Sequence, residues 1–256
     1  MIPIALTIAG SDPSGGAGIQ ADLKTFHQLH VYGAAAITLI TVQNTTRVSR
    51  VEMLDPALVS EQIDAVLEDL PPQAAKTGAL GTAVIVEAVA GRLIACPLVV
   101  DPVMISKHGA PLMDSTARDA LRKLLLPKAA LVTPNLHEAA ELAGMSVDNL
   151  DRMREAAIRI GGSVLIKGGH LSGDSVDLLY HDGGFTELRA VRIDTRHTHG
   201  TGCTYSAAIT AFLARGVPMV EAVTRAKRFI DEAIRTSPGI GAGSGPVNHW
   251  VFDDSL

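Results

Sequence analysis

Two glycine-rich turns in the sequence are able to hold a ligand through their backbone. The first is Gly10-Ser11-Asp12-Pro13-Ser14-Gly15-Gly16-Ala17-Gly18, and the second is Thr198-His199-Gly200-Thr201-Gly202-Cys203-Thr204. Glycine lets a backbone approach a ligand closely, and the first turn of a helix offers unpaired N–H groups at the positive end of its dipole. Because a long apolar helical pattern follows the second turn, we expect Gly200, Thr201 and Gly202 to form an anion hole.

The first glycine-rich turn is weaker evidence for ligand binding than the second. It lacks the Lys-Ser/Thr ending of a P-loop, and Gly16 to Ala21 fits only a loose form of the dinucleotide fingerprint. That fingerprint needs an acidic residue about 20 positions later to hold a ribose, but the apolar run Ala36 to Ile40 stands there. A dinucleotide oxidoreductase is therefore set aside, and a turn that needs glycine for steric reasons alone remains the alternative.

Cys203 stands in the first turn of the helix that follows the second glycine turn. The pKa of a thiol falls at a helix N-terminus, so we expect the thiolate to be favoured and Cys203 to act as a general base. A small buried packing residue is the competing interpretation. For Cys96, which precedes Pro97 and an apolar strand, packing is the preferred interpretation.

Several polar side chains follow short apolar runs, where ligands gather in open α/β sheets. Asp101 ends the run Leu98-Val99-Val100, and Lys167 follows Val164-Leu165-Ile166. Asn135 and Glu138 begin a helical pattern, and with Asp101 they offer the oxygen ligands that suit Mg²⁺, which takes one or two carboxylates beside phosphate. They are also spaced as a helix-capping pair, and both roles stay open.

Gln43 follows an apolar strand that we expect to end at Ile40-Thr41. Its amide both donates and accepts, which complements an amino group beside a ring nitrogen. An ordinary surface glutamine is the alternative.

The elements that must position these residues alternate along the chain between short apolar runs and longer helical patterns. This alternation predicts an α/β fold, a three-layer sandwich with a mostly parallel central sheet and helices on both faces. The expected strands are Ile4 to Ala9, Ala34 to Ile40, Ala74 to Lys76, Leu98 to Asp101, Ala130 to Val132 and Val164 to Ile166. The expected helices are Gly18 to Leu29, Pro56 to Leu67, Ala83 to Leu93, Ser115 to Leu125, Leu136 to Ala143, Leu150 to Ile160, Thr201 to Leu213 and Met219 to Arg235.

One pair of segments departs from this alternation. Val176 to Tyr180 and Phe185 to Arg189 flank His181-Asp182-Gly183-Gly184, which predicts an antiparallel hairpin at one edge of the sheet. No linker, low-complexity block or repeat divides the chain, so residues 1–256 are expected to form a single domain.

Composition limits the classes of function. Of the 256 residues 47% are hydrophobic and 19% are charged, which excludes a disordered chain, and a net charge of -5 leaves no broad basic face for nucleic acid. The N-terminal apolar run lacks a basic flank and no run reaches the ~18 residues of a membrane span. Two cysteines make no disulfide framework, so we expect a reducing compartment, the cytoplasm.

Six segments together resemble the ribokinase superfamily, and within it the bacterial hydroxymethylpyrimidine/phosphomethylpyrimidine kinases of thiamine biosynthesis. The segments, in order along almost the full chain, are residues 9–24, Val42-Gln43-Asn44-Thr45, Asp101-Pro102-Val103-Met104, Thr133-Pro134-Asn135-Leu136, Lys167-Gly168-Gly169-His170 and His199 to Thr204. The resemblance implies a ribokinase-like fold and the use of ATP and Mg²⁺. It further implies phosphorylation of the hydroxymethyl group of the aminopyrimidine, and then of the monophosphate.

The resemblance also implies roles for individual residues and an oligomeric state. It places Gln43, Asp22 and Gly10 at the pyrimidine, Gly200, Thr201, Gly202 and Cys203 at the transferred phosphoryl group, Lys167, Asn135 and Thr198 at the nucleotide, and Asp101 and Glu138 at the metal. By the same analogy the chain forms a homo-oligomer, expected to be a dimer.

Two departures from the family pattern affect these implications. Most ribokinase-like sugar kinases carry an Asp where Cys203 stands, and the family often has Met where this chain has Ala79. The smaller residue leaves room beside the substrate ring, which makes a pyridoxal kinase the alternative function. A ligand-binding protein without catalysis is a third hypothesis, against which the intact Gly200 to Cys203 turn and Lys167 argue.

Overall fold

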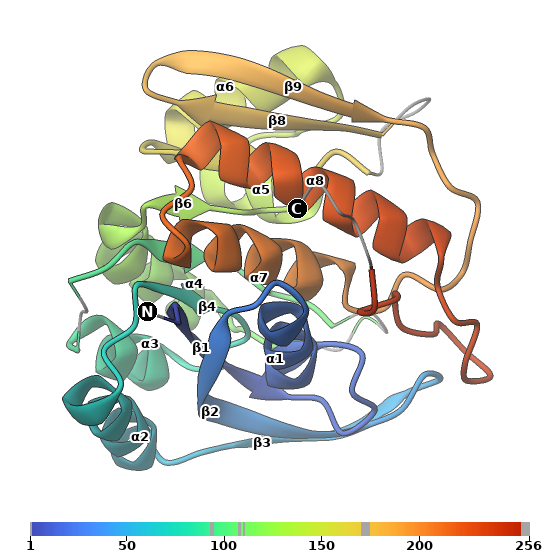
Figure 1. The fold of residues 1–256 in the computed structure, drawn as a ribbon. Helices are drawn as coiled ribbons and strands as arrows, with labels where there is room; N and C mark the ends of the chain where they lie inside the picture. Colours follow the sequence, from blue (N-terminus) through green and yellow to red (C-terminus); the bar gives the residue numbers. More distant parts are fainter. Residues whose placement is uncertain (1, 93–94, 107–108, 110, 170–174, 252–256) are drawn as a thin grey trace.

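The computed structural model describes residues 2–92, 95–106, 109, 111–169 and 175–251. In this part of the chain nine strands form one sheet in the order β3-β2-β1-β4-β5-β6-β7-β8-β9 (Figure 1). The strands are β1 (Ile4–Ser11), β2 (Tyr32–Gln43), β3 (Val48–Met53), β4 (Ala74–Thr77), β5 (Leu98–Val100), β6 (Leu131–Val132), β7 (Val164–Ile166), β8 (Ser175–His181) and β9 (Gly184–Ala190). Neighbours from β2 to β7 are parallel, whereas β3, β8 and β9 run antiparallel to their partners.

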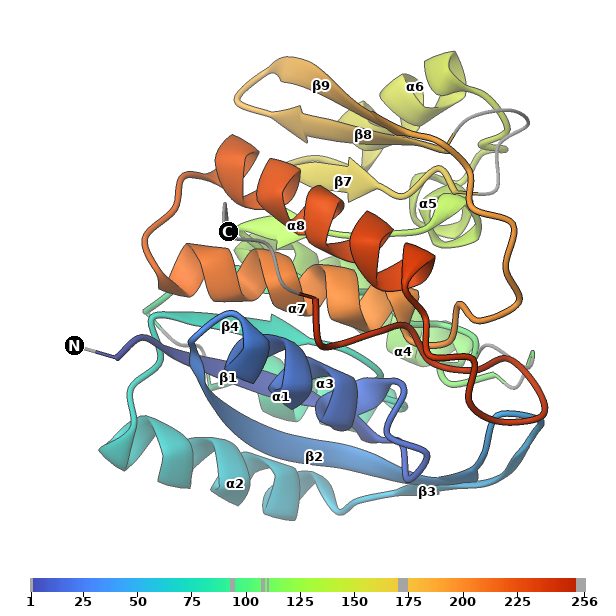
Figure 2. The same cartoon turned by 45° about the vertical axis from the view of Figure 1, so that its right-hand side comes forward.

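Helices cover both faces of the sheet, as Figures 1 and 2 show. They are α1 (Gly18–Gln28), α2 (Pro56–Asp69), α3 (Ala83–Ala90), α4 (Ser115–Ala120), α5 (Leu136–Ala143), α6 (Leu150–Ile160), α7 (Thr201–Ala214) and α8 (Met219–Arg235). Successive strand residues point to opposite faces. Ala5 accordingly packs with α1, α7 and α8, whereas Leu6 and Ile8 pack with α2, α3 and α4. On the latter face, α5 and α6 cover β7 and β8.

The predicted fold class is confirmed, and the structure adds a second antiparallel edge. Strand β3 pairs with β2, which continues to Gln43 instead of ending at Ile40-Thr41. Because β3 has the mixed sequence Val48-Ser49-Arg50-Val51-Glu52-Met53 and its side chains are exposed or half-buried, it carries no strong apolar signal. Helix α3 ends at Ala90, and Leu93, the expected end, lies outside the described residues.

Within the described residues, no helix is both long enough and apolar enough to pass through a lipid bilayer.

His249 is a buried histidine whose titration is expected to limit stability in acid. It is 6% exposed, and its Nε2 lies 3.1 Å from Thr204 Oγ1 at the start of α7. Burial lowers the pKa of His249 to about 4, and the positive charge of Lys24 acts in the same direction. His249 is therefore protonated near pH 6.5 in the unfolded chain but only near pH 4 in the folded protein. The unfolding free energy consequently falls as the pH drops from 6.5 towards 4.

We predict that His249→Gln removes this loss. Between pH 7.5 and pH 5 the unfolding free energy of the unsubstituted protein should fall by about 2 kcal/mol more than that of the variant. Urea unfolding at both pH values measures the difference, with His27→Gln, on an exposed position of α1, as the matched control. Equal acid losses in all three proteins would contradict the prediction.

Candidate active site

Two buried ion pairs lie in the interior towards the carboxyl ends of the parallel strands. Asp22 of α1 accepts from Lys76 of β4 at 2.8 Å between Oδ1 and Nζ, and both side chains are 0% exposed. Asp101, directly after β5, accepts from Lys167, directly after β7, at 2.9 Å. The strand order thus brings Asp101 and Lys167 together across the sheet, as expected for residues that follow parallel strands.

Hydroxyl groups hold both carboxylates in place. Thr7 of β1 donates to Asp22 Oδ2 at 2.6 Å. Thr133 donates to Asp101 Oδ1 at 3.1 Å, and Ser206 of α7 donates to Asp101 Oδ2 at 3.2 Å. Both aspartates therefore belong to hydrogen-bonded networks with fixed orientation.

Burial alone raises the pKa of both aspartates, but the surrounding charges make the net shift upward for Asp22 and downward for Asp101. For Asp22, burial raises the pKa above the ordinary value, although Lys76 and Thr7 oppose it. For Asp101, burial also favours the neutral acid, but Lys167 and Lys76 outweigh it and hold the pKa below the ordinary value. Asp101 is consequently the carboxylate of this site that stays ionised most readily.

The second glycine turn lies directly against the Asp101–Lys167 pair. A Cβ placed on Gly202 would lie 3.3 Å from Lys167 Nζ and 3.8 Å from Asp101 Oδ2. Gly200 has a φ of 78°, and a Cβ there would lie only 1.7 Å from the carbonyl oxygen of Gly16. Gly200 therefore needs glycine, whereas Gly202 places the backbone of the turn within reach of the lysine at the positive end of α7.

Cys203 lies within the electrostatic influence of Lys76, Asp22 and Asp101. Burial raises the pKa of its thiol to about 12, although the positive charge of Lys76 and a hydrogen bond from the backbone N–H of Gly18 oppose this. The expectation that the thiolate is favoured is therefore wrong for the protein alone, because burial and the negative charges of Asp22 and Asp101 outweigh Lys76 and the N–H of Gly18. The role of Cys203 as a base stays a prediction.

Asn135 and Glu138 form the capping pair that the spacing allowed. Asn135 Oδ1 accepts from the backbone N–H of Glu138 at 2.9 Å, and Glu138 Oε2 accepts from the backbone N–H of Asn135 at 2.8 Å. Burial raises the pKa of Glu138 to about 7, with a further rise from Asp101 and a lowering by Lys167. Glu138 therefore belongs to the same charge cluster as Asp101, and its metal role stays a prediction.

The remaining predicted residues lie on β1, on β2 and in the loop before α7. Gln43 is the half-buried last residue of β2, and the tip of the β2–β3 hairpin is tied to the C-terminal glycine-rich loop by Ser244 N–H donating to Thr45 O at 2.8 Å. A Cβ on Gly10 would meet Leu39 at 2.5 Å. Thr198 O accepts from Thr201 Oγ1 at 2.8 Å at the start of α7. His170 lies outside the described residues.

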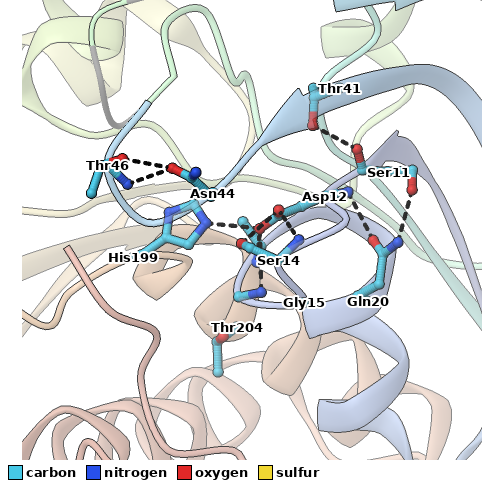
Figure 3. Close-up of polar contacts among 12 residues, drawn as sticks. Ser11, Asp12, Ser14, Gly15, Gln20, Thr41, Asn44, Thr46, His199 and Thr204 are labelled. Carbon is cyan, nitrogen blue, oxygen red and sulfur yellow. Dashed lines mark hydrogen bonds and ion pairs between the residues drawn. The ribbon is translucent and has the colours of Figure 1, made fainter. Parts of the chain in front are cut away.

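Sequence reasoning gave no role to three polar residues of this region, Lys76, Asp12 and His199. Lys76 lies inside an expected strand, and the sequence pattern assigns it no role. A lysine in a buried apolar run nevertheless indicates that a carboxylate faces it. Asp12 and His199 stand within the two glycine turns and bond to each other at 2.8 Å (Figure 3). Their contact joins segments far apart in the sequence, which spacing alone does not reveal.

Comparisons with known proteins identify the family. Residues 12–248 match the family described as phosphomethylpyrimidine kinase. The chain is 49% identical to the hydroxymethylpyrimidine/phosphomethylpyrimidine kinase of Synechococcus elongatus, covering 97% of this chain and 98% of that protein. It is 48% identical to a thiamine biosynthesis bifunctional protein of Geobacter sulfurreducens over 98% of this chain, but it spans only 53% of that longer protein.

Solved structures agree with this relationship. A phosphomethylpyrimidine kinase from Clostridium difficile is similar with a TM-score of 0.80 and 44% identity, covering 91% of this chain and 99% of that chain. A pyridoxal kinase from Bacillus subtilis, solved as an ADP complex, has a TM-score of 0.90 and 41% identity, covering 97% and 98%. The family match and the full-length relatives confirm what the six sequence segments implied: the chain belongs to the phosphomethylpyrimidine kinase family.

Proposed function

We propose that this kinase transfers a phosphoryl group from ATP to the hydroxymethyl group of 4-amino-5-hydroxymethyl-2-methylpyrimidine, and then phosphorylates the monophosphate to the diphosphate. The observation that carries the proposal is the approach of the Gly200 to Cys203 turn to Lys167 and Asp101. Phosphoryl transfer depends mainly on positioning and on neutralising charge, and a helix N-terminus beside a buried lysine supplies both. The names of the full-length relatives favour the pyrimidine substrate.

In this proposal each part of the cluster has a separate task. The backbone N–H groups of Gly202 and Cys203 face the phosphoryl group during transfer, and Lys167, with Asn135 and Thr198 nearby, binds the nucleotide phosphates. Cys203, whose thiol holds its proton in the protein alone, receives the hydroxyl proton only if the bound substrates lower its pKa. Catalysis therefore rests on the anion hole more than on the base, and Cys203→Ala should be slow but not inactive.

Asp101 and Glu138 fit a magnesium ion bound with the nucleotide. Each is a carboxylate with little exposure, and the pKa of Glu138 is raised to about 7 mainly by burial and further by Asp101, so a nearby cation would favour the ionised form of Glu138 that can bind it. Mg²⁺ usually binds through one or two carboxylates, waters and substrate phosphates. When bound, the ion would supply positive charge to the phosphate oxygens.

An assay with the pyrimidine alcohol, ATP and Mg²⁺ tests the proposed reaction. Mass spectrometry should detect the monophosphate first and the diphosphate later. Pyridoxal is the second candidate substrate, because Ala79 is a small residue and pyridoxal kinases are among the similar structures. A competition assay with both substrates should give the higher kcat/KM for the pyrimidine; a higher value for pyridoxal would reverse the assignment.

Gln43→Leu is expected to separate the pyrimidine site from the nucleotide site. If the Gln43 amide meets the aminopyrimidine edge, its loss leaves polar groups of the ring unpaired and raises KM for the pyrimidine at least about 30-fold. KM for ATP should change less than about threefold. Gln73→Leu, which alters an amide bonded to the backbone of Ile4 at the start of β1, is the matched control. Equal changes in both KM values would place Gln43 elsewhere.

We further propose that residues 1–256 act as one domain in the cytoplasm and form a dimer. The continuous nine-stranded sheet supports the single domain, and the two free cysteines suit a reducing compartment. Ile40 and Val42 of β2 are exposed on one face of the sheet and support a second copy of the chain as the partner that covers this face. Sedimentation of the protein and of Val42→Lys tests the dimer, which the lysine should dissociate.

A further inference from the structure

We propose that Asp12 and His199 are positioning residues that fix the anion-binding turn relative to the first glycine turn. His199 Nε2 lies 2.8 Å from Asp12 Oδ2, and the two residues stand at the start of α7 and directly after β1 (Figure 3). They are 4% and 1% exposed. This pair, which we call the clamp, is a buried side-chain connection between the two glycine turns.

The carboxylate of Asp12 is fully engaged in holding the first turn. Its Oδ1 accepts from the backbone N–H of Ser14 at 2.8 Å and from Ser14 Oγ at 2.7 Å. Its Oδ2 accepts from the backbone N–H groups of Gly16 at 3.2 Å and Ala17 at 2.9 Å, as well as from His199. Burial by itself favours the neutral acid, but His199 and Ser14 outweigh it and keep the pKa of Asp12 below its ordinary value. Asp12 is therefore an ionised acceptor, and it has no capacity left for a metal or a reacting proton.

On the other side, His199 connects the clamp to the anion-binding turn. Its backbone N–H donates to Gly245 O at 3.0 Å, and its carbonyl oxygen accepts from Val247 N–H at 3.3 Å. Because an ionised carboxylate only accepts, the ring donates from Nε2. The next residue is Gly200, whose backbone is so close to Gly16 O that no side chain fits between the turns. The clamp thus holds the backbone of Gly200 against the backbone of Gly16.

This geometry assigns the clamp an effect on the transfer step. The inference rests on the proposed role of the Gly200 to Cys203 turn. Asp101, the ion-pair partner of Lys167, is held by Thr133, which lies outside both glycine turns, as well as by Ser206 of α7, so ATP binding should survive loss of the clamp. A displacement of the amides by about 1 Å can cost about 100-fold in rate. The clamp should therefore act on kcat and leave KM for ATP nearly unchanged.

His199→Phe tests this prediction, because the phenyl ring fills a similar volume but cannot donate to Asp12. We expect kcat to fall at least about 50-fold with KM for ATP within about threefold. His199→Gln, which retains a donor, should restore at least about fivefold of the lost kcat. His181→Phe is the matched control, since that histidine bonds to Ser163 in a distant part of the sheet and should leave kcat unchanged.

Binding measurements distinguish positioning from a general structural role. The affinity for ADP with Mg²⁺ and aluminium fluoride, a mimic of the phosphoryl group in flight, should fall with kcat in His199→Phe, whereas the affinity for ADP with Mg²⁺ should not. An unchanged kcat, or equal loss of both affinities, would overturn the inference. If His199→Phe does not fold, as judged by circular dichroism, Asp12→Asn gives the same kcat and affinity comparisons.

The Gly202→Asp variant separates failure of this inference from failure of the proposed site. Wild-type turnover in Gly202→Asp would refute the anion-binding turn itself. An inactive Gly202→Asp together with full activity in His199→Phe would refute the clamp alone.

Discussion

Gly202→Asp is expected to lower kcat at least about 1000-fold while the protein remains folded. The new side chain would begin 3.3 Å from Lys167 Nζ and 3.8 Å from Asp101 Oδ2, in the space that the proposal gives to the phosphoryl group. Its carboxylate would pair with Lys167 and repel both Asp101 and the incoming phosphate. Removal of one donor from a preorganised anion hole already costs about 100- to 1000-fold, and here a negative charge is added as well.

Steady-state kinetics with the pyrimidine alcohol measures this loss, and two further variants interpret it. Gly202→Ala adds only a methyl group and should lower kcat less than Gly202→Asp does. The difference between the two variants separates the effect of side-chain volume from the effect of charge. Gly184→Asp places the same side chain on exposed β9, where a Cβ meets only ordinary contacts, and should leave kcat unchanged. Retention of turnover by Gly202→Asp would remove the phosphoryl group from this turn.

The sequence predicted those parts of the site that follow from strand order. Asp101 and Lys167 are 66 positions apart, yet each follows a short apolar strand, and parallel strands place such residues at one edge. The spacing of Asn135 and Glu138 likewise predicted the capping pair found at α5. In both cases local pattern was enough, because the geometry of a strand end or a helix start decides the contact.

Such local patterns do not predict contacts between segments that are far apart in the sequence. Lys76 has its partner Asp22 on a different element, and no periodicity relates a β4 lysine to an α1 aspartate. The bond between Asp12 and His199 depends on how two irregular turns pack against each other. Strand β3 was not predicted because it is an edge strand of mixed sequence that contains no apolar run.

The direction of the Cys203 pKa shift illustrates a third kind of limit. From the sequence only the helix dipole is visible, and it favours the thiolate. The folded chain adds burial and the negative charges of Asp22 and Asp101, and their sum raises the pKa to about 12. The position at a helix N-terminus alone does not decide the direction of the shift, because the contributions that raise the pKa come from parts of the chain brought close only by folding.

Lys76→Met is expected to lower the unfolding free energy by about 3–5 kcal/mol, the usual cost of leaving one partner of a buried ion pair alone. Asp22 would keep only the hydroxyl of Thr7 as a partner, in a site where both charged side chains are 0% exposed. Adding Asp22→Asn to this variant removes the unpaired charge and should recover at least half of the loss. Urea unfolding of the single and double variants measures both effects.

The pH dependence of Lys76→Met provides the decisive signature. Burial already raises the pKa of Asp22 against the opposition of Lys76, so without the lysine the folded protein should bind a proton there at higher pH than the unfolded chain does. Stability of the variant should then rise as pH falls from 8 to 5.5, relative to the unsubstituted protein. Asp22→Asn should abolish that relative rise. A pH-independent loss in Lys76→Met would mean that its cause is lost packing rather than an uncompensated charge, and that the pair contributes its volume and not its electrostatics to the core.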